Sequence, residues 1–408
     1  MATPANSSTE PFPVLFIGGG NITFGNDNVH WNHSLRIERY LGSRLDVVGI
    51  VDPSEDRVIK VLAQKRTSSA ASCYLRTQRF DGLDEAAATL KANGVSPKLI
   101  ILAVPPHLRG TLEPGHNLEE QVIKAFGKSP AIFCEKPVST ARPHEVVAVV
   151  ELLERSGNVI SVGYMLRYLK VVQKAMSIIR ENDLMVMAVN ARYTVAYSKM
   201  RKFDWWDKSK QCGPIVEQAT HFCDLCRYLG GEVAMDSVRA LALEHSEPPG
   251  KLSHMSAEID DSRVPEHERI PRATMAMWKF RSGAIGSLAH IIALHGTRYS
   301  NEIVVTADGY QLRLVDLYTT PTLYVRTPLS EKEEVFAYQD DDPFYSEFAA
   351  LFDSIESEPR DVDVGRTAGS TDPAATPGRI LSTYGDAHKT YEFTWRIRDE
   401  SERPSGSR

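Results

Sequence analysis

The chain has 408 residues, more than the roughly 100–200 of an ordinary domain, so its length predicts two domains. A quarter of the residues are charged and the net charge is -6, which provides no basic surface for DNA or RNA and excludes nucleic acid as a partner. No stretch reaches the roughly 18 apolar residues of a membrane span, and the first ten residues have no signal-peptide pattern. We therefore expect a cytoplasmic protein.

Short apolar segments alternate with amphipathic ones in the first 165 residues. The apolar segments are Val14–Ile17, Leu45–Val51, Leu99–Val104, Ala131–Cys134 and Val159–Tyr164. Strands buried on both faces show such runs, and Pro143–Arg155 has the apolar spacing of a helix. The alternation predicts an α/β fold with a doubly wound parallel sheet.

The second half shows hairpin patterns instead. Strands are predicted at Ala273–Phe280, Ala284–Leu294, Asn301–Ala307 and Tyr310–Leu317, with Asp308–Gly309 as a two-residue turn before the last. Hairpins predict a mostly antiparallel, open-faced sheet in an α+β domain, through which we expect a homodimer or homotetramer. Glu247–Pro271 and Arg360–Gly378 are predicted loops outside the core. We place the domains at 11–164 and 165–400, with disordered tails at 1–10 and 401–408.

A glycine-rich turn, Gly18-Gly19-Gly20-Asn21-Ile22-Thr23, follows the first predicted strand. Such a turn lets backbone N–H groups meet a pyrophosphate, although Thr23 stands where a third glycine is usual, and an ordinary turn is the alternative. Asp52 ends the second strand, where an acidic residue binds ribose hydroxyls and repels a 2′-phosphate, so NAD is expected in preference to NADP. The predicted cofactor-binding residues are Gly18, Gly20, Asn21, Ile22, Asp52, Pro105, Pro106, His107, Glu135 and Lys136.

Lys136 and a later helix are the predicted catalytic elements. Lys136 follows an apolar strand, so it should lie at the carboxyl edge of the parallel sheet, and Pro137 after it fixes the backbone there. In the predicted helix Gly213–Leu229, Glu217, His221 and Asp224 share one face, as acid–base chemistry needs. The alternatives are a buried His–Glu hydrogen bond or a metal pair, and for a metal the sequence shows no third ligand.

Other residues have a purely structural explanation beside the functional one. Cys223 and Cys226 form a C-x-x-C pattern, but they lie in an apolar helical pattern, where we expect small core residues rather than a redox or zinc site. Tyr164, Arg167, Tyr193 and Trp206 are candidate substrate contacts, and for the tryptophan the alternative is plain packing or a subunit contact.

These features together resemble the Gfo/Idh/MocA oxidoreductases, the family of glucose–fructose oxidoreductase and inositol dehydrogenase. The resemblance rests on the glycine turn, Pro105-Pro106, Glu135-Lys136-Pro137, Val162-Gly163-Tyr164 with Arg167-Tyr168, the Gly213-to-Asp224 helix and a late helix at Phe348–Phe352. It implies that Lys136 contacts the substrate hydroxyl and the nicotinamide ribose and that His221 is the acid/base. The implied reaction is hydride transfer between the nicotinamide and a carbinol or carbonyl carbon of a sugar, polyol or similar metabolite.

The chain departs from the family pattern at four positions. Glu217 stands where many members carry aspartate, Ala219 replaces a frequent glycine, Thr23 a frequent glycine or alanine, and Arg109 a frequent histidine. The resemblance also covers NAD-dependent glycosidases, reductases of non-sugar substrates, and a yeast galactose-pathway repressor that binds ligand without catalysis. Those functions remain alternatives.

Overall fold

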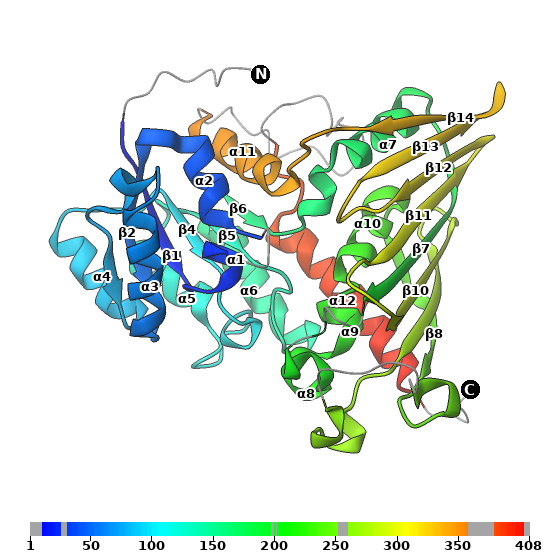
Figure 1. Ribbon diagram of the computed structural model, residues 1–408, viewed down its shortest axis with the longest axis horizontal. Helices are drawn as coiled ribbons and strands as arrows, with labels where there is room; N and C mark the ends of the chain where they lie inside the picture. Colours follow the sequence, from blue (N-terminus) through cyan, green and yellow to red (C-terminus); the bar gives the residue numbers. More distant parts are fainter. Residues whose placement is uncertain are drawn as a thin grey trace.

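Two β-sheets organise the chain, one on each side of the molecule in Figure 1. The computed structural model describes residues 10–25, 31–196, 200, 202–251, 260–357 and 379–403. The predicted loop Arg360–Gly378 and most of both predicted tails lie outside these residues. In the described part, no helix combines the length and apolar character needed to cross a membrane.

The first sheet is parallel throughout, as predicted, with the order β3-β2-β1-β4-β5-β6. Its strands are β1 (Phe12–Ile17), β2 (Leu45–Val51), β3 (Gln78–Phe80), β4 (Leu99–Leu102), β5 (Ala131–Cys134) and β6 (Ile160–Val162). The apolar runs located every strand except β3, which is short and contains two polar residues. The order reverses direction between β1 and β4, which is where doubly wound sheets bind their ligands.

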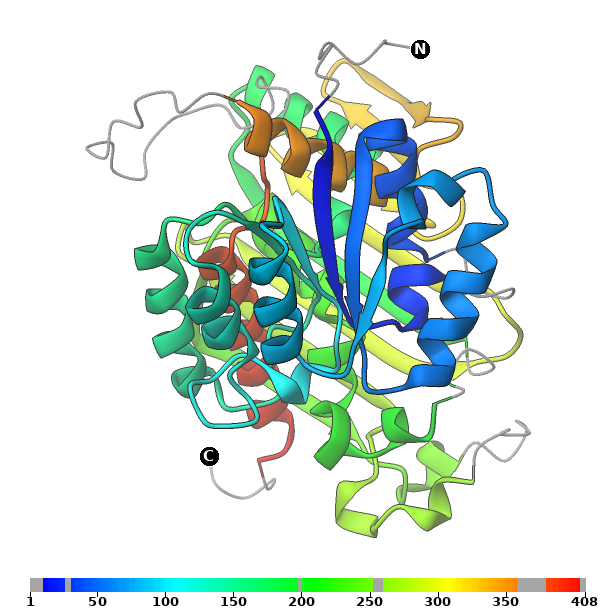
Figure 2. The same ribbon diagram turned by 90° about the vertical axis from the view of Figure 1, so that its left-hand side faces the viewer.

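Helices cover both faces of this sheet (Figure 2). They are α1 (Asn21–Phe24), α2 (His33–Leu41), α3 (Glu55–Arg66), α4 (Leu83–Ala92), α5 (Leu118–Phe126) and α6 (Pro143–Ser156). Apolar side chains of α1, α2 and α3 pack on one face and those of α4, α5 and α6 on the other. The prediction of a doubly wound fold is confirmed, and α6 matches the helix predicted from its apolar spacing.

The second sheet has the order β14-β13-β12-β11-β7-β10-β9-β8, antiparallel except for the β7–β10 pair. Its strands are β7 (Val186–Ala196), β8 (Val233–Leu243), β9 (Ala273–Phe280), β10 (Ile285–Leu294), β11 (Ser300–Ala307), β12 (Tyr310–Val315), β13 (Thr322–Thr327) and β14 (Ser330–Ala337). The predicted hairpin is confirmed, because Ala307 pairs with Tyr310 across Asp308–Gly309. The sequence patterns did not locate β7, β8, β13 or β14.

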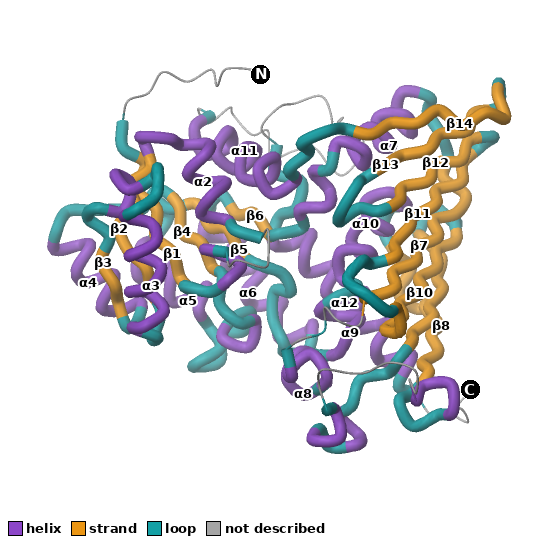
Figure 3. The backbone as a smooth tube through the Cα atoms, in the orientation of Figure 1, coloured by secondary structure: helices purple, strands orange, loops and turns teal. Residues whose placement is uncertain are grey.

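Helices cover only the inner face of the second sheet among the described residues (Figure 3). The helices of this half are α7 (Lys170–Glu181), α8 (Lys208–Gln211), α9 (Gly213–Glu217), α10 (Thr220–Gly230), α11 (Pro343–Glu356) and α12 (Tyr384–Ser401). Strand β9 shows the two faces: Trp278 and Phe280 are buried against the helices, whereas Met275 and Met277 are exposed.

Helices α11 and α12 return to the first sheet and join the two halves. Phe348 and Phe352 of α11 pack in the core beneath α2, and Tyr384 and Trp395 of α12 pack with α6. The expectation that Glu247–Pro271 contributes no core residues is wrong for its described part, because Val264 and Ile270 are buried beneath the second sheet. Two apolar side chains in a charged loop left no periodic signal, so only the tertiary structure places them.

Candidate active site

The glycine turn lies at the carboxyl end of β1, beside the end of β4. Gly18 has φ +105°, and an added Cβ would lie 2.5 Å from the carbonyl oxygen of Ala103, so only glycine fits there. At Gly20, in contrast, an added Cβ would meet nothing within 4 Å. The turn is therefore closed against the sheet at Gly18 and has open space at Gly20, as the approach of a pyrophosphate requires.

Thr23, in the place of the usual third glycine, closes the turn with its own side chain. It is buried, and its Oγ1 donates a hydrogen bond of 2.9 Å to the carbonyl oxygen of Gly18. The predicted cofactor residues Asn21 and Ile22 begin the short helix α1 directly after Gly20. The departure from the family pattern thus keeps the turn tight.

Asp52 connects the ends of β1 and β2. Its Oδ2 accepts hydrogen bonds from Gly19 N at 2.8 Å and from an Nη of Arg57 at 3.0 Å, and its Oδ1 accepts one from Ser54 N. Asp52 is buried, whereas the Arg57 side chain is 54% exposed. Across the switch point, Pro105 precedes a single helical turn that begins at Pro106 and contains His107. The glycine turn, Asp52 and this proline loop thus line one sheet edge, and their space and charge fit a dinucleotide.

Lys136, Glu217 and His221 come together at that edge. The Lys136 Nζ donates a hydrogen bond of 2.9 Å to the Glu217 carbonyl oxygen and lies 3.4 Å from its Oε1. Both side chains are mostly buried, with 18% and 16% exposed. The peptide bond between Lys136 and Pro137 is cis. The Lys136 side chain thus faces a carboxylate from the second half of the chain.

The prediction of one continuous helix over Gly213–Leu229 is wrong, because the helix is interrupted between α9 and α10. The backbone N–H groups of Gln218 and Ala219 both donate to the Pro214 carbonyl oxygen, which widens the turn. The Glu217 carbonyl oxygen accepts instead from Lys136, 81 residues earlier in the chain. The break thus gives Lys136 a backbone partner that an unbroken helix would have used internally.

His221 is 7% exposed and stands with its ring edge-on to Tyr164 and Tyr318. Burial first, and then the charge of Lys136, hold its pKa well below the usual value. Its Nδ1 has no hydrogen-bond partner among the described residues. Its surroundings therefore favour the neutral imidazole form, with Nδ1 left without a partner among the described residues.

Three tyrosines lie close enough to Glu217 for its charge to act on their pKa values, and only Tyr193 among them was a predicted substrate contact. Burial, and then the negative charge of Glu217, raise the pKa of Tyr299 to about 12. Tyr318 forms edge or tilted ring contacts with Tyr193, Tyr299 and His221. Tyr193 is 5% exposed and stacks on Phe222. Tyr299 and Tyr318 belong to no sequence motif, so only tertiary structure reveals them.

The other three predicted substrate contacts have internal partners. The Tyr164 hydroxyl bonds Thr220 Oγ1 at 2.9 Å, and Trp206 Nε1 donates to the Met200 carbonyl oxygen at 2.9 Å. Arg167 is 3% exposed and pairs with Asp224, through Nε at 2.7 Å, and with Asp386. These contacts give all three side chains partners within the protein, and their role as substrate contacts stays a prediction.

Glu135 has a partner that the sequence did not indicate. Its Oε1 lies 2.6 Å from Nε2 of His33, which is fully buried at the start of α2. Burial acts to raise the pKa of Glu135, but the hydrogen bond from His33 and the charges of His33 and Lys136 lower it below the usual value. Glu135 is therefore an ionised carboxylate next to Lys136.

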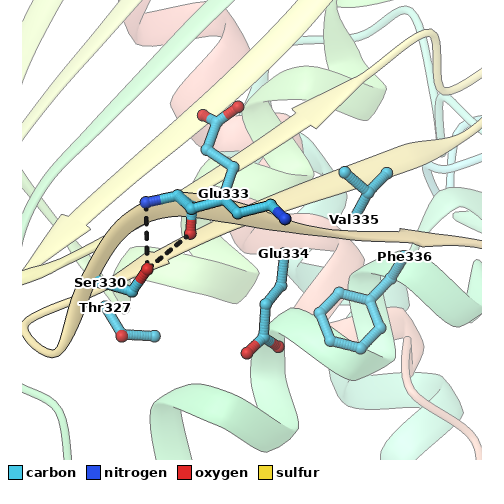
Figure 4. Close-up of a pocket in the computed structure, with 7 residues that line it drawn as sticks. Thr327, Ser330, Glu333, Glu334, Val335 and Phe336 are labelled. Atoms are coloured by element: carbon cyan, nitrogen blue, oxygen red, sulfur yellow. Dashed lines mark hydrogen bonds between the residues drawn. The ribbon is translucent and has the colours of Figure 1, made fainter.

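Other candidate sites receive no support in the described residues. The described residues contain no group of three or more metal-binding side chains. Cys223 and Cys226 are buried, free thiols, as expected for core residues. A hollow of about 490 Å³ runs along the sheet edge at β14, between Thr327 and Phe336, and includes none of the predicted site residues (Figure 4).

A doubly wound sheet with a glycine turn at its switch point and a lysine and a histidine at the same edge defines an NAD(P)-dependent oxidoreductase. Family profiles agree: one described as an oxidoreductase family with an NAD-binding Rossmann fold matches residues 12–164, and one for an oxidoreductase C-terminal domain matches 167–310. The chain belongs to the Gfo/Idh/MocA oxidoreductase family.

Similar proteins extend over almost the whole chain. Two uncharacterised proteins of Schizosaccharomyces pombe, UNK4.17 and C12C2.04, are 42% and 37% identical to it. The alignments cover 95% of this chain in both cases, with 91% and 97% of the relatives. A levoglucosan dehydrogenase, solved with NADH and L-sorbose, superposes with a TM-score of 0.68 at 15% identity over 96% of each chain. That likeness shows a shared fold.

Proposed function

We propose that this protein is an NAD(P)-dependent dehydrogenase or reductase that acts on a carbinol or carbonyl carbon of a sugar, polyol or similar small metabolite. The observation that carries the proposal is the meeting of Lys136, Glu217 and a neutral His221 at the sheet edge that bears the glycine turn. The sugar named in the complex of the levoglucosan dehydrogenase supports the substrate class.

The N-terminal domain would hold the dinucleotide at the switch point. The backbone at Gly20 would face its pyrophosphate, Gly18 would keep the turn tight against the sheet, and Asp52 would face the adenosine ribose. When bound there, the cofactor supplies the hydride acceptor or donor. We place Glu135, Asn21, Ile22 and the Pro105–His107 loop against it by their position along the same edge.

The proposed proton transfer belongs to His221. Because burial and Lys136 keep the imidazole neutral, it can accept the proton of a substrate hydroxyl during oxidation and return it during reduction. The Lys136 ammonium would donate a hydrogen bond to the same oxygen and stabilise its developing negative charge. Glu217 holds Lys136 through a backbone and a side-chain oxygen, which fixes the direction of the ammonium.

The test combines a cofactor-binding assay with a substrate panel. Binding of NADH is followed by fluorescence, and sugars, polyols and carbonyl compounds are then screened for stoichiometric change in nicotinamide absorbance. Lys136→Ala should bind NADH nearly as the wild type does and lose turnover, whereas turnover retained by Lys136→Ala contradicts the assignment. Substrate conversion without net NADH indicates transient oxidation, as in the glycosidase alternative. NADH binding without conversion of any compound indicates the regulator.

We infer a preference for NAD over NADP from Asp52, whose carboxylate would repel a 2′-phosphate. Arg57 weakens that repulsion because it pairs with Asp52 at 3.0 Å while over half of its side chain remains exposed. Because the Asp52 carboxylate still disfavours a 2′-phosphate, wild-type protein should bind NADH more tightly than NADPH, and Asp52→Ser should narrow the difference. An unchanged ratio of the two affinities in Asp52→Ser contradicts the inference.

We also propose a homodimer or homotetramer formed through the outer face of the second sheet. Leu241, Met275, Met277 and Ile285 lie on neighbouring strands and are between 49% and 62% exposed. Adjacent large apolar side chains on a face that no described helix covers are typical of an interface. The cytoplasmic location stays a prediction, which microscopy of the tagged protein would test.

A further inference from the structure

Arg109 lies beneath the segment that carries Lys136. Its side chain is 1% exposed, and its guanidinium donates to the carbonyl oxygens of Glu135 and Val138, the latter at 3.0 Å. It also donates to Cys134 Sγ at 3.1 Å. One rigid, planar group thus binds the backbone on both sides of the Lys136–Pro137 peptide.

The two loops are also interlocked by their backbones. Ser139 Oγ donates a hydrogen bond of 3.0 Å to the Arg109 carbonyl oxygen. Gly110 has φ +88°, and an added Cβ would lie 2.4 Å from Cβ of Ser139. The loop after β4 therefore contacts the loop after β5 too closely for either to shift independently.

A buried carboxylate completes this arrangement. Glu119 of α5 is fully buried, and its Oε2 accepts a hydrogen bond of 2.9 Å from Gly110 N. Its Oε1 accepts one of 3.0 Å from the hydroxyl of Tyr384, on α12. Burial raises the pKa of Glu119, while the charge of Arg109 acts to lower it. The contacts of Arg109 and Gly110 around the Lys136 segment are thus connected to the C-terminal helix through Glu119 and Tyr384.

We propose that Arg109 is a positioning residue, which fixes the backbone around Lys136 so that its ammonium meets Glu217 and the reacting oxygen. Its own side chain is buried under the loop and donates hydrogen bonds to three protein atoms. It therefore acts through Lys136 rather than on the substrate. The kinetic part rests on the proposed function, and the structural part does not. A displacement of about 1 Å at a reacting group can reduce turnover about 100-fold, which sets the expected effect.

The experiment compares full-length Arg109→Met and Arg109→Lys with the wild type. Arg272→Met is the control, since Arg272 is also a buried arginine that bonds a backbone carbonyl, that of Gly250, in another loop, where it also pairs with Asp261. Hydrogen–deuterium exchange of the peptide spanning 135–139, NADH affinity, and kcat on a compound found in the substrate panel are measured for each.

Arg109→Met should accelerate exchange in 135–139 and lower kcat about 100-fold while NADH affinity changes less than about threefold. Arg109→Lys should fall between Met and wild type, because lysine keeps the charge but lacks the planar fork of donors that reaches both carbonyl oxygens. Arg272→Met should leave that peptide and kcat unchanged.

Unchanged exchange in Arg109→Met overturns the proposal, as does faster exchange with wild-type kcat. An equal effect of Arg272→Met overturns it too, since the effect is then general destabilisation. If wild-type protein converts no compound, the proposed function fails, and the exchange comparison still decides whether Arg109 holds the loop. If Arg109→Met does not fold, Arg109→Met/Glu119→Gln, which removes both buried charges, is measured in its place.

Discussion

Separate replacement of Gly18 and Gly20 should show that Gly18 is needed for folding and Gly20 for cofactor binding. Alanine at Gly18 would adopt φ +105° and place its Cβ 2.5 Å from the Ala103 carbonyl oxygen. The backbone conformation destabilises by about 1–2 kcal/mol and the overpacking by about 1–3 kcal/mol. At about 2–4 °C per kcal/mol, the melting temperature should fall by at least about 4 °C.

Gly20→Ala is the matched change in the same turn. Gly20 has φ -77° and ψ 179°, which alanine adopts readily, and its Cβ would meet nothing within 4 Å. The melting temperature of the cofactor-free protein should therefore change by less than about 2 °C, as for a surface substitution. NADH affinity should fall at least about tenfold, because the methyl group would occupy the space left for the pyrophosphate.

Thermal denaturation of both variants, with and without saturating NADH, measures the two effects together. Wild type and Gly18→Ala should both be stabilised by NADH, from different starting temperatures, whereas Gly20→Ala should gain little. Wild-type NADH affinity in Gly20→Ala would refute the placement of the cofactor. A melting temperature of Gly18→Ala equal to that of the wild type would refute the steric argument.

Three further predictions concern charge, burial and assembly. Lys136→Met should raise the pKa of His221, because the Lys136 charge helps to lower it, and NMR titration of the His221 ring would show no change if the two groups were not coupled. Glu347 is buried, and burial first, then the charges of Glu135 and Asp224, raise its pKa well above the usual value. Its stability contribution is thus present below the unfolded pKa and lost as pH rises toward the folded pKa, so Glu347→Gln should gain stability over wild type as pH rises above about 4.3, and parallel stability–pH curves would contradict this. Met277→Glu on the outer sheet face should yield monomers in analytical ultracentrifugation, and an unchanged oligomer, or a wild-type monomer, would exclude that face as the interface.

Local patterns in the sequence sufficed for every strand of the first sheet except β3 and for the position of Lys136. Strands buried on both faces are continuous apolar runs, so Leu45–Val51 and Ala131–Cys134 were located to the residue. The glycine turn comes directly after its strand in the sequence. The hairpin at Asp308–Gly309 is indicated by the two turn residues between two strand patterns. These features depend on neighbouring residues, which a sequence shows directly.

The second sheet was only half predicted because its strands have one exposed face. In β7, exposed Asn190 and Arg192 alternate with buried Val189 and Ala191, so no continuous apolar run marks the strand. Similarly, Glu217 and His221 were placed on one unbroken helix by their spacing of four. The hydrogen bond from Lys136 to the Glu217 carbonyl oxygen arises from a distant segment, so the spacing could not reveal the break.

The sequence by itself thus determined the parallel sheet, the glycine turn and the lysine and histidine of the candidate site, because each has a local pattern. Only the tertiary structure paired Glu135 with His33, 102 residues away, directed Arg167 to Asp224, and set Arg109 under Lys136. The physical reason is that a buried polar group must find a partner wherever the fold brings one. That partner is chosen by how the elements pack, which the order of residues along the chain does not display.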